Sequence, residues 1–367
     1  MKVGVIGVKG MPSRVSGLEI HADYVAQGLA ESGADIIVFC RKRYCSQILK
    51  EYKKMQIVYI PSINTKHLDA ISYSFFAVIA ALFMRCDIFW FHALGPSIMA
   101  WLPRVFKKKI ICTVHGLDWK RDKFGNLASK VLKYGEQSIA RYADEIIVLN
   151  NMDADYFYHN YERKCKIIPN GIAVRDKRKA DEITQKYGIR EKEYFLFASR
   201  IVPEKKLEIL LKAYMNIRTD KKLVVVGKGV HTDTYENEMK KLAADNSNII
   251  FTGFISGNCL KELYSNAYAY ILPSTIEGQS LGLLEAMSYG NACIVSNIDE
   301  NVCVIKQYGL AFENGNEIDL TKKLEYVLEN EQKVYELGKG ARELCLKEHR
   351  WEDVIKQTVE VFEEIWK

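Results

Sequence analysis

Proline and long apolar runs are both scarce in this chain. Its 367 residues include 7 prolines, and its 23 glycines follow no repeat, which excludes collagen-like and Pro-rich linker classes. The longest apolar run, 71–84, falls short of the roughly 20 residues that a membrane-spanning helix needs. The first residues form a strand-like run without the apolar core and cleavage site of a signal peptide. We therefore expect no membrane span and no leader.

Paired cysteines are also missing. The 9 cysteines include no CxxC pair, and several lie inside apolar runs. This pattern predicts reduced packing residues in a cytoplasmic protein and no structural zinc. Asp153-x-Asp155 has the spacing of a metal-binding DxD pair but falls within an expected helix, so we predict no metal site there.

Composition and length favour a globular protein of two domains. Hydrophobic residues make up 48% and charged residues 27% of the chain. The net charge of +6 is unevenly divided, because residues 1–180 carry 28 Lys and Arg against 16 Asp and Glu, whereas the remainder carries 24 against 30. Basic clusters lie at 41–43, 107–109 and 120–123. The asymmetry indicates attraction to an anionic membrane surface or another polyanion, but a solvated face with counter-ions explains it equally well.

Short β-branched runs alternate with helical patterns along the whole chain. The runs are continuously apolar, which is typical of strands buried on both faces of a parallel sheet. Leu18, Ala22, Val25 and Leu29 share one helix face, and Gly33 follows as a residue that ends the helix. The thirteen predicted strands are 2–7, 35–40, 57–60, 88–91, 110–114, 145–149, 166–168, 194–198, 222–226, 248–251, 269–272, 292–296 and 309–312.

One sheet rarely takes so many strands, and the polar stretch 174–192 contains no strand-like run. We predict an α/β fold of two doubly wound, Rossmann-like parallel-sheet domains joined at this stretch, residues 1–173 and 174–349. The helical pattern over about 350–367 is expected to pack back across the junction onto the first domain.

Ligands of open parallel sheets bind beyond the carboxyl ends of the strands, so the segments that follow strands are the candidate sites. After the first strand, a loop with Gly10 and Gly17 precedes a helix, where backbone N–H groups can hold an anion. The loop does not match GxGxxG, which argues against a nicotinamide site. His92 and His115 follow the fourth and fifth predicted strands. Such a histidine can bond to a ligand, although a structural role is commoner.

The second predicted domain carries a more specific set of charges. Arg200 and Lys205 follow its first strand, and two cations at the mouth of a sheet predict an anionic ligand such as phosphate. Glu277 lies in the loop after the fourth strand, and Glu285 lies in a helix that begins near Ser280. The two carboxylates can accept hydrogen bonds from sugar or ribose hydroxyls, while the start of the helix favours a phosphate.

These motifs resemble those of the retaining, GT-B-fold glycosyltransferases, specifically the bacterial group that includes glycosyltransferase family 4. Glu277-x7-Glu285 is similar to the E-x7-E motif of the family, and Ser199-Arg200-x4-Lys205 to its diphosphate-binding pair. Residues 168–172 resemble the end of its first domain, and residues 7–19 its glycine loop, although Ser16-Gly17 replaces the common paired glycine. The resemblance covers nearly the whole chain and implies two domains that face a central cleft.

The resemblance implies transfer of a sugar from a nucleotide diphosphate sugar, with retention at the anomeric carbon and without a metal or other cofactor. Arg200 and Lys205 would hold the diphosphate, Glu285 the ribose and Glu277 the donor sugar. His115 would contact an outer hydroxyl of the sugar and support the reacting centre. The other donor-binding residues that the resemblance implies are Gly10, Gly17, Gly253, Phe254, Gly278, Gln279, Ser280 and Leu281.

Residues 115–121 and 7–12 resemble transferases that build bacterial capsule, exopolysaccharide or O-antigen, some with deoxysugar donors such as rhamnose. This implies a UDP- or dTDP-sugar donor and a polyprenyl-diphosphate-linked saccharide as acceptor. It also implies a cytoplasmic protein bound peripherally to the inner face of the cytoplasmic membrane. Apolar residues near 73–76 or 101–106 are expected to be exposed and to strengthen that contact.

Two other functions stay open, and a third is disfavoured. A nucleotide-sugar 2-epimerase would share the fold but not the combination of Arg200 and Lys205 with E-x7-E. A non-catalytic sugar-nucleotide-binding partner of a transferase is opposed by the intact Glu277 and His115. Nucleic-acid binding is disfavoured by the acidic second half and by the lack of any nucleic-acid-binding module.

Overall fold

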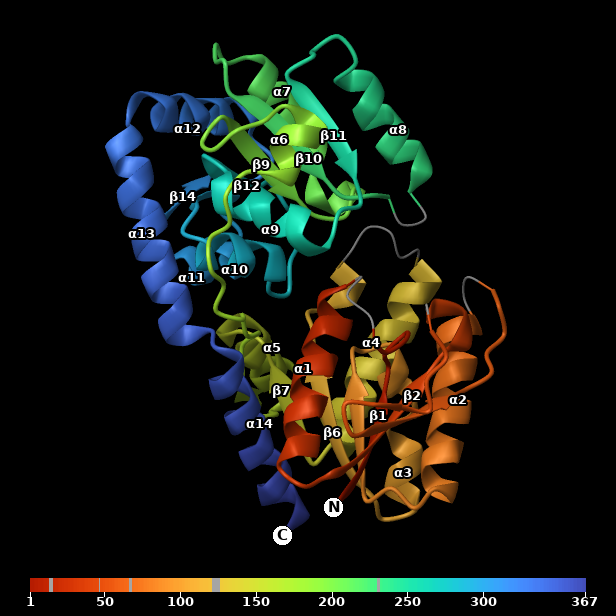
Figure 1. Ribbon diagram of the computed structural model, residues 1–367. Helices are drawn as coiled ribbons and strands as arrows, with labels where there is room; N and C mark the ends of the chain where they lie inside the picture. The colour runs from red at the N-terminus through yellow and green to blue at the C-terminus, as the bar shows by residue number, and fades with distance from the viewer. Residues whose placement is uncertain (13–15, 46, 66–67, 121–125, 230–231) are drawn as a thin grey trace. The chain divides into compact units, whose positions relative to one another are not determined.

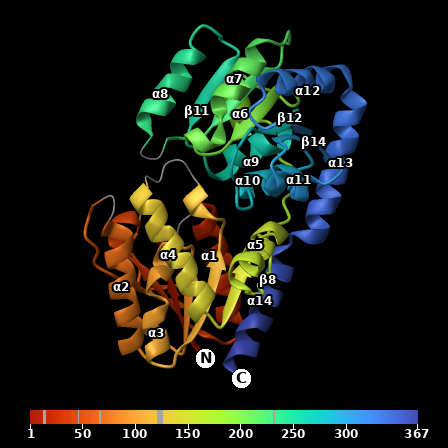
Figure 2. The same ribbon diagram turned by 180° about the vertical axis from the view of Figure 1, so that it is seen from behind.

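The computed structural model describes the chain except residues 13–15, 46, 66–67, 121–125 and 230–231. The chain forms two compact units. Unit 1 consists of Met1–Gly171 and Trp351–Lys367, and unit 2 consists of Ile172–Arg350. Each unit is a twisted sheet with helices on both faces (Figures 1 and 2). Unit 2 is therefore inserted in the sequence between two parts of unit 1.

Unit 1 is built on an eight-stranded sheet with the order β3-β4-β2-β1-β5-β6-β7-β8. Neighbouring strands are parallel except β3 and β4, which form an antiparallel hairpin at one edge. The strands are β1 (Lys2–Ile6), β2 (Asp35–Cys40), β3 (Glu51–Tyr52), β4 (Met55–Tyr59), β5 (Ile88–His92), β6 (Lys109–Val114), β7 (Glu145–Val148) and β8 (Lys166–Ile167).

Helices cover both faces of this sheet. On one face, α1 (Gly17–Glu31) packs against α14 (Trp351–Trp366), where Tyr24 stacks on Trp351. Phe362 of α14 meets the ring of Trp90 in β5, so the end of the chain completes the core of unit 1. The core on the other face is covered by α2 (Leu68–Phe83), α3 (Trp101–Val105), α4 (Asn126–Tyr142) and α5 (Asn151–Tyr161).

Unit 2 has a six-stranded parallel sheet with the order β11-β10-β9-β12-β13-β14. The strands are β9 (Tyr194–Ala198), β10 (Lys222–Val226), β11 (Ile249–Gly253), β12 (Ala269–Leu272), β13 (Ala292–Ser296) and β14 (Gly309–Phe312). The helices are α6 (Glu182–Tyr187), α7 (Leu207–Met215), α8 (Asp233–Leu242), α9 (Gly257–Asn266), α10 (Leu281–Ser288), α11 (Asp299–Ile305), α12 (Glu317–Glu329) and α13 (Glu331–Glu348).

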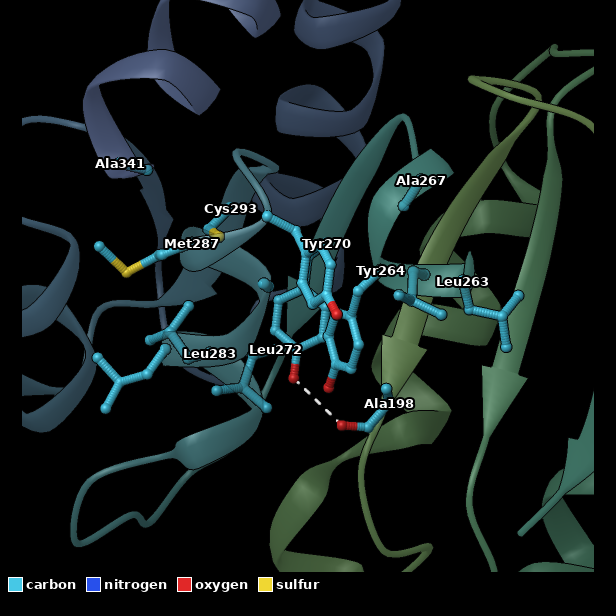
Figure 3. Close-up of a cluster of buried hydrophobic side chains, with 14 of the residues drawn as sticks. Ala198, Leu263, Tyr264, Ala267, Tyr270, Leu272, Leu283, Met287, Cys293 and Ala341 are labelled. Atoms are coloured by element: carbon cyan, nitrogen blue, oxygen red, sulfur yellow. Dashed lines mark hydrogen bonds between the residues drawn. The ribbon is translucent and has the colours of Figure 1, made fainter. Parts of the chain in front are cut away.

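The two central strands of unit 2, β9 and β12, are apolar and buried along their whole length. In β9, Tyr194 and Leu196 belong to one core cluster, whereas Phe195 and Phe197 belong to the cluster on the opposite face. Figure 3 shows the first cluster, in which the Tyr270 hydroxyl donates a hydrogen bond of 3.2 Å to the carbonyl oxygen of Ala198. The packed aromatic side chains of this cluster thus contact and support the carboxyl end of β9.

The predicted fold, α/β with two Rossmann-like parallel-sheet domains, is confirmed. All thirteen predicted strands are present, some with shifted ends. The edge strand β3 was not predicted, because a strand of two residues has no apolar pattern to read. Helix α1 ends as predicted, with Gly33 at a φ of +98° just beyond it. Within the polar stretch 174–192, α6 anchors itself in the core through the buried Ile183.

The cysteines and the helices bear on two further expectations. All 9 cysteines are free thiols, and six of them are buried packing residues. None of the helices in the described part of the chain has both the length and the apolar character that a bilayer crossing requires.

Candidate active site

The strand order of each unit marks where a ligand is expected to bind. In unit 2 the order reverses between β9 and β12, and in unit 1 it reverses between β1 and β5. Loops that leave neighbouring strands in opposite directions open a crevice at such a switch point. In unit 2 these are the loops that hold Arg200, Lys205 and Glu277. In unit 1 they are the glycine loop and the segment that begins at His92.

The two loops at the switch point of unit 2 are joined by an ion pair. The Lys205 ammonium donates to the Glu277 carboxylate, and both side chains are only 9% exposed. Lys205 is placed by a turn of 3₁₀ helix, Pro203–Lys205, and the backbone N–H of Thr275 donates to the carbonyl oxygen of Glu204 at 3.0 Å. Lys205, in the loop after β9, and Glu277, in the loop after β12, are therefore ion-paired, and a backbone hydrogen bond joins the two loops.

Arg200 lies in the loop after β9, like Lys205, but it differs from Lys205 in its exposure and its contacts. Its side chain is partly exposed, and it makes no hydrogen bond or ion pair with the residues that the structure describes. Its backbone is held close to the end of β10, where Gly227 has a φ of +140°. A Cβ on Gly227 would lie 1.8 Å from the carbonyl oxygen of Ser199, so only glycine fits there. Among the described residues the Arg200 guanidinium thus has no partner, and the backbone before it packs closely against the end of β10.

The second acidic residue and its neighbours lie around the start of α10. Ser280 caps this helix, since its hydroxyl accepts a hydrogen bond of 3.3 Å from the backbone N–H of Leu283. Glu285 is partly exposed one turn into the helix, as predicted. Gly278 is buried, and Gln279 and Leu281 are partly exposed. The loop amides and the helix N-terminus together offer a setting that favours an anion.

The predicted contact to the nucleotide base lies at the end of β11. Gly253 is the last residue of that strand and has a φ of +71°, and a Cβ there would meet no atom within 4 Å. Phe254 follows with 60% of its surface exposed. An exposed aromatic ring at the carboxyl edge of a sheet is available to pack against a flat ligand.

In unit 1, the glycine loop after β1 is closed by a carboxylate. Gly10 is buried, whereas Gly17 is exposed and begins α1. Glu19 is buried and accepts hydrogen bonds from the Ser16 hydroxyl and, at 3.2 Å, from the backbone N–H of Lys9. Residues 13–15 of the loop lie outside the described residues, as does most of the basic cluster at 120–123.

Three histidines meet at the switch point of unit 1. His92 ends β5 and His115 follows β6, with His92 Nδ1 only 3.1 Å from His115 Nε2. His21 of α1 packs edge-on against His115, with ring centroids 4.9 Å apart. Its Nδ1 lies 2.9 Å from Oδ1 of Asn170. Gly7 allows this approach, because a Cβ there would lie 2.4 Å from the His92 carbonyl oxygen.

Burial keeps these three imidazoles neutral. It lowers the pKa of His21 to about 4, although the hydrogen bond to Asn170 acts in the opposite direction. It lowers the pKa of His92 and of His115 well below 6.5, and the neighbouring histidines lower both further. Within the described residues, no group of histidine, cysteine and acidic side chains is arranged as a set of metal ligands.

The hydrogen bonds of the cluster also select a tautomer of His115. His92 Nε2 is buried and has no hydrogen-bond partner among the described residues. A proton on that nitrogen would be a buried donor without an acceptor, whereas a proton on Nδ1 is used in the bond to His115. His92 is therefore best assigned as the donor, and His115 as the acceptor at Nε2. His115 then carries its own proton on Nδ1.

Sequence reasoning found part of this arrangement. Lys205 was predicted to bind the diphosphate and Glu277 to bind the donor sugar, but the ion pair between them was not predicted. His21 and Asn170 were missed as site residues, because a helix face and a distant loop give no sign in the sequence of the histidine they meet. The predicted exposure of 73–76 is wrong at Tyr73, which is fully buried and donates to the Phe39 carbonyl oxygen. Phe75 and Phe76 are exposed.

Comparison with known families agrees with this geometry in both halves of the chain. Residues 15–176 match the family model described as Glycosyltransferase Family 4. Residues 179–344 match the model described as Glycosyl transferases group 1. The protein is a glycosyltransferase of the GT-B type.

Individual relatives are distant, and they cover from about half to the whole of the chain. An uncharacterised glycosyltransferase of Methanocaldococcus jannaschii is 23% identical, over 99% of this chain and 98% of its own. The UDP-Gal:alpha-D-GlcNAc-diphosphoundecaprenol alpha-1,3-galactosyltransferase of Escherichia coli is 27% identical, over 54% of each chain. The sucrose-phosphate synthase of Thermosynechococcus elongatus has the same fold, with a TM-score of 0.88, 18% identity and coverage of 100% of this chain and 99% of its own.

Proposed function

We propose that this glycosyltransferase moves a sugar from a nucleotide diphosphate sugar to a lipid-linked saccharide in bacterial surface polysaccharide synthesis, with retention at the anomeric carbon. A UDP- or dTDP-sugar is the proposed donor, and deoxysugars such as rhamnose are among the candidate sugars. The observation that carries the proposal is the buried Lys205–Glu277 pair at the switch point of unit 2, with Arg200, which has no partner among the described residues, in the same loop as Lys205.

The ion pair suggests how the donor would be received. Before the donor binds, Lys205 and Glu277 compensate each other, so neither buried charge is left unpaired. A diphosphate would bring Lys205 a second anion and leave Glu277 free to accept hydrogen bonds from sugar hydroxyls. Arg200 would add a forked pair of donors. Negative charge grows on the diphosphate as the glycosidic bond breaks, so two cations fixed beside it stabilise the transition state without a metal.

The histidine cluster suits a positioning role rather than proton transfer. An imidazole whose pKa lies well below 6.5 is a weak general base and carries no charge to repel an oxocarbenium-like centre. The proton on Nδ1 would let His115 donate a hydrogen bond to a sugar hydroxyl. For the acceptor we propose attack from the face that the diphosphate leaves, with a departing phosphate oxygen taking the proton. In this proposal Glu277 accepts hydrogen bonds from the donor sugar and is not assigned as a nucleophile.

Donor binding is the first test. Thermal shift against a panel of UDP-, dTDP- and GDP-sugars is expected to single out one nucleotide. Arg200→Gln should weaken that binding about tenfold or more, which is the loss of a charge-assisted contact. Arg218→Gln, an exposed arginine elsewhere in unit 2, is the matched control and should bind normally. Failure of every nucleotide sugar to bind would contradict the proposal.

Product analysis tests the reaction itself. With the donor so identified and a polyprenyl-diphosphate-linked saccharide, we expect a lipid-linked product extended by one sugar, whose anomeric configuration NMR would show to match that of the donor. An inverted product would exclude retention. Release of an epimerised nucleotide sugar without any acceptor would identify a 2-epimerase instead. Unchanged glycan output in cells carrying Glu277→Ala would indicate a non-catalytic binding partner.

We also propose that the protein acts in the cytoplasm, attached to the inner face of the membrane by unit 1. Phe83 at the end of α2 is 84% exposed, and Val105 and Phe106, the last residue of α3 and the next one, are 67% and 57% exposed. Lys107 and Lys109 follow directly. Apolar side chains flanked by lysines are typical of peripheral binding to anionic lipid. Flotation with anionic vesicles but not with neutral ones is expected, and equally weak binding to both would contradict it.

A further inference from the structure

A group of cations surrounds one exposed tyrosine at the carboxyl edge of the unit 1 sheet. Lys9 follows β1, and Arg41 and Arg43 follow β2. Each lies over the ring of Tyr44, with Lys9 Nζ at 5.6 Å and the two guanidinium carbons at 5.0 Å from the ring centre. Backbone contacts fix the group, because Arg41 N–H donates to the Lys9 carbonyl oxygen at 2.8 Å. We call Lys9, Arg41, Arg43 and Tyr44 the edge cluster.

The edge cluster holds more positive charge than the described residues neutralise. Asp69, in the first turn of α2, is paired with Arg41 at 2.8 Å and also with Arg43, and it accepts from the Tyr44 hydroxyl at 3.0 Å. Burial favours the neutral acid, but hydrogen bonds and the two arginines outweigh it and lower the pKa of Asp69, so this carboxylate is ionised. Asp69 is thus paired with two of the three cations, while Glu19 accepts from the backbone N–H of Lys9, and three cations lie near two acids.

One donor of the edge cluster is buried without an acceptor. Arg41 is 6% exposed, and its Nε has no hydrogen-bond partner among the described residues. Burying an unsatisfied donor on a charged group is costly, and an anionic ligand that reached the cluster would relieve that cost. Such a ligand would also lie beside the glycine loop, because a Cβ on Gly10 would come within 3.2 Å of the Tyr44 carbonyl oxygen.

An apolar stripe begins where the edge cluster ends. Helix α2 starts at Leu68, next to Asp69, and exposes Leu68, Phe75, Phe76 and Phe83 by 47%, 42%, 43% and 84%. Residues seven or eight apart lie on one side of a helix, so these side chains form a single row along its outer face. A row of exposed phenylalanines is unusual for a surface that faces only water. Unit 1 thus offers cations that could bind an anionic group and, next to them, apolar side chains that could contact a hydrocarbon chain.

We propose that the edge cluster binds the diphosphate of a long-chain isoprenyl diphosphate, and that the first half of the apolar stripe, Leu68 to Phe76, receives the start of its chain. The inference rests on the proposed function, because it assigns a binding site to the lipid-linked acceptor. It differs from general attraction to a membrane, since the cations and the stripe together select a diphosphate joined to an apolar chain rather than any anionic surface.

Binding can be measured without donor or transfer. The probe is a long-chain isoprenyl diphosphate in neutral phosphatidylcholine vesicles. Matched vesicles contain the isoprenyl alcohol, or phosphatidylglycerol of equal charge, and soluble inorganic pyrophosphate tests the head group alone. We expect tight flotation with the diphosphate, little with the alcohol, and competition by pyrophosphate only at much higher concentration. Equal binding to phosphatidylglycerol, or no preference over the alcohol, would overturn the proposal.

Two variants locate the site. Arg43→Gln and Lys9→Gln should each weaken diphosphate binding about tenfold, the loss of one charge-assisted contact. Arg141→Gln is the matched control, because Arg141 is also exposed and lies over a tyrosine, with its guanidinium 5.4 Å from the ring of Tyr142, at the opposite edge of the sheet. Normal thermal stability of both variants would exclude misfolding as the cause.

Nucleotide-sugar binding to unit 2, measured on the same preparations, separates this inference from the proposed function. If the donor binds and the isoprenyl diphosphate does not, the edge cluster is not the acceptor site, while the transferase proposal stands. If R43Q and K9Q bind the diphosphate as well as Arg141→Gln does, the site lies elsewhere in the chain.

Discussion

Units 1 and 2 share a fold, yet they keep polar side chains at their switch points in opposite ways. Unit 2 buries two full charges, Lys205 and Glu277, and balances each against the other. Unit 1 buries three titratable rings and keeps all of them uncharged. A buried pair of opposite charges is ready to exchange a partner for a charged ligand. Buried neutral imidazoles can form hydrogen bonds that orient an uncharged ligand. The contrast is the basis on which we propose a diphosphate ligand for unit 2 and sugar hydroxyls for unit 1.

The largest expected effect comes from removing the cation of the buried pair. Lys205→Ala should lower kcat/KM by about 10³-fold, because a fixed charge beside the leaving diphosphate is lost. It should also destabilise unit 2 by about 3 kcal/mol, since Glu277 stays buried without its partner. Lys186→Ala, which breaks the exposed pair with Glu182, is the control and should cost less than about 1 kcal/mol. Steady-state kinetics and hydrogen exchange on β9 and β12 would measure both effects.

A double substitution sharpens this result. Lys205→Met combined with Glu277→Gln should be less destabilising than the sum of the two single changes, because no unpaired charge remains. Additive losses would mean that the two side chains do not interact in solution. Activity should not recover in the double variant, since the diphosphate still lacks its cation.

The pH dependence of unit 1 tests the other half of the comparison. The pKa of His21 is lowered to about 4 in the folded state, so the unfolded chain takes up the proton first as the pH falls. The stabilisation is complete above about pH 6.5 and is lost as the pH falls toward 4, by about 3 kcal/mol from His21 alone. All 5 tryptophans lie in unit 1, so urea titration followed by their fluorescence reports on that unit. A midpoint that did not move over this range would contradict the assignment.

The smallest expected effect concerns His92, which acts through His115. His115→Ala should lower kcat about 100-fold, because one fixed hydrogen-bond donor to the sugar is lost. His92→Gln should lower it about tenfold, because the hydrogen bond that fixes the tautomer of His115 is weakened. NMR of labelled imidazoles would show whether the Nδ1-protonated form of His115 is lost along with activity. His159→Gln, on an exposed helix face of unit 1, should change neither quantity.

The sequence predicts much of this molecule because strands buried on both faces are continuously apolar. The ends of those strands then place Arg200, Lys205, Glu277 and His115 at one edge of their sheets. Contacts between residues that are far apart in the chain could not be predicted in this way. The Lys205–Glu277 pair joins residues 72 positions apart, and the His21–Asn170 bond joins residues 149 apart. No local pattern encodes such contacts. Tyr73 was misplaced because α2 is apolar on every side, so that periodicity could not tell its inner face from its outer one.

The insertion of unit 2 within unit 1 has a consequence for synthesis on the ribosome. Unit 2 is complete once Arg350 has been made, but unit 1 still waits for α14, which supplies Phe362 to the core beside Trp90. The half of the protein that is translated first is therefore finished last, and the part of its sheet that α14 covers stays uncovered during the interval. A nascent chain arrested before α14 should expose those apolar side chains to chaperones, although its second unit is already complete.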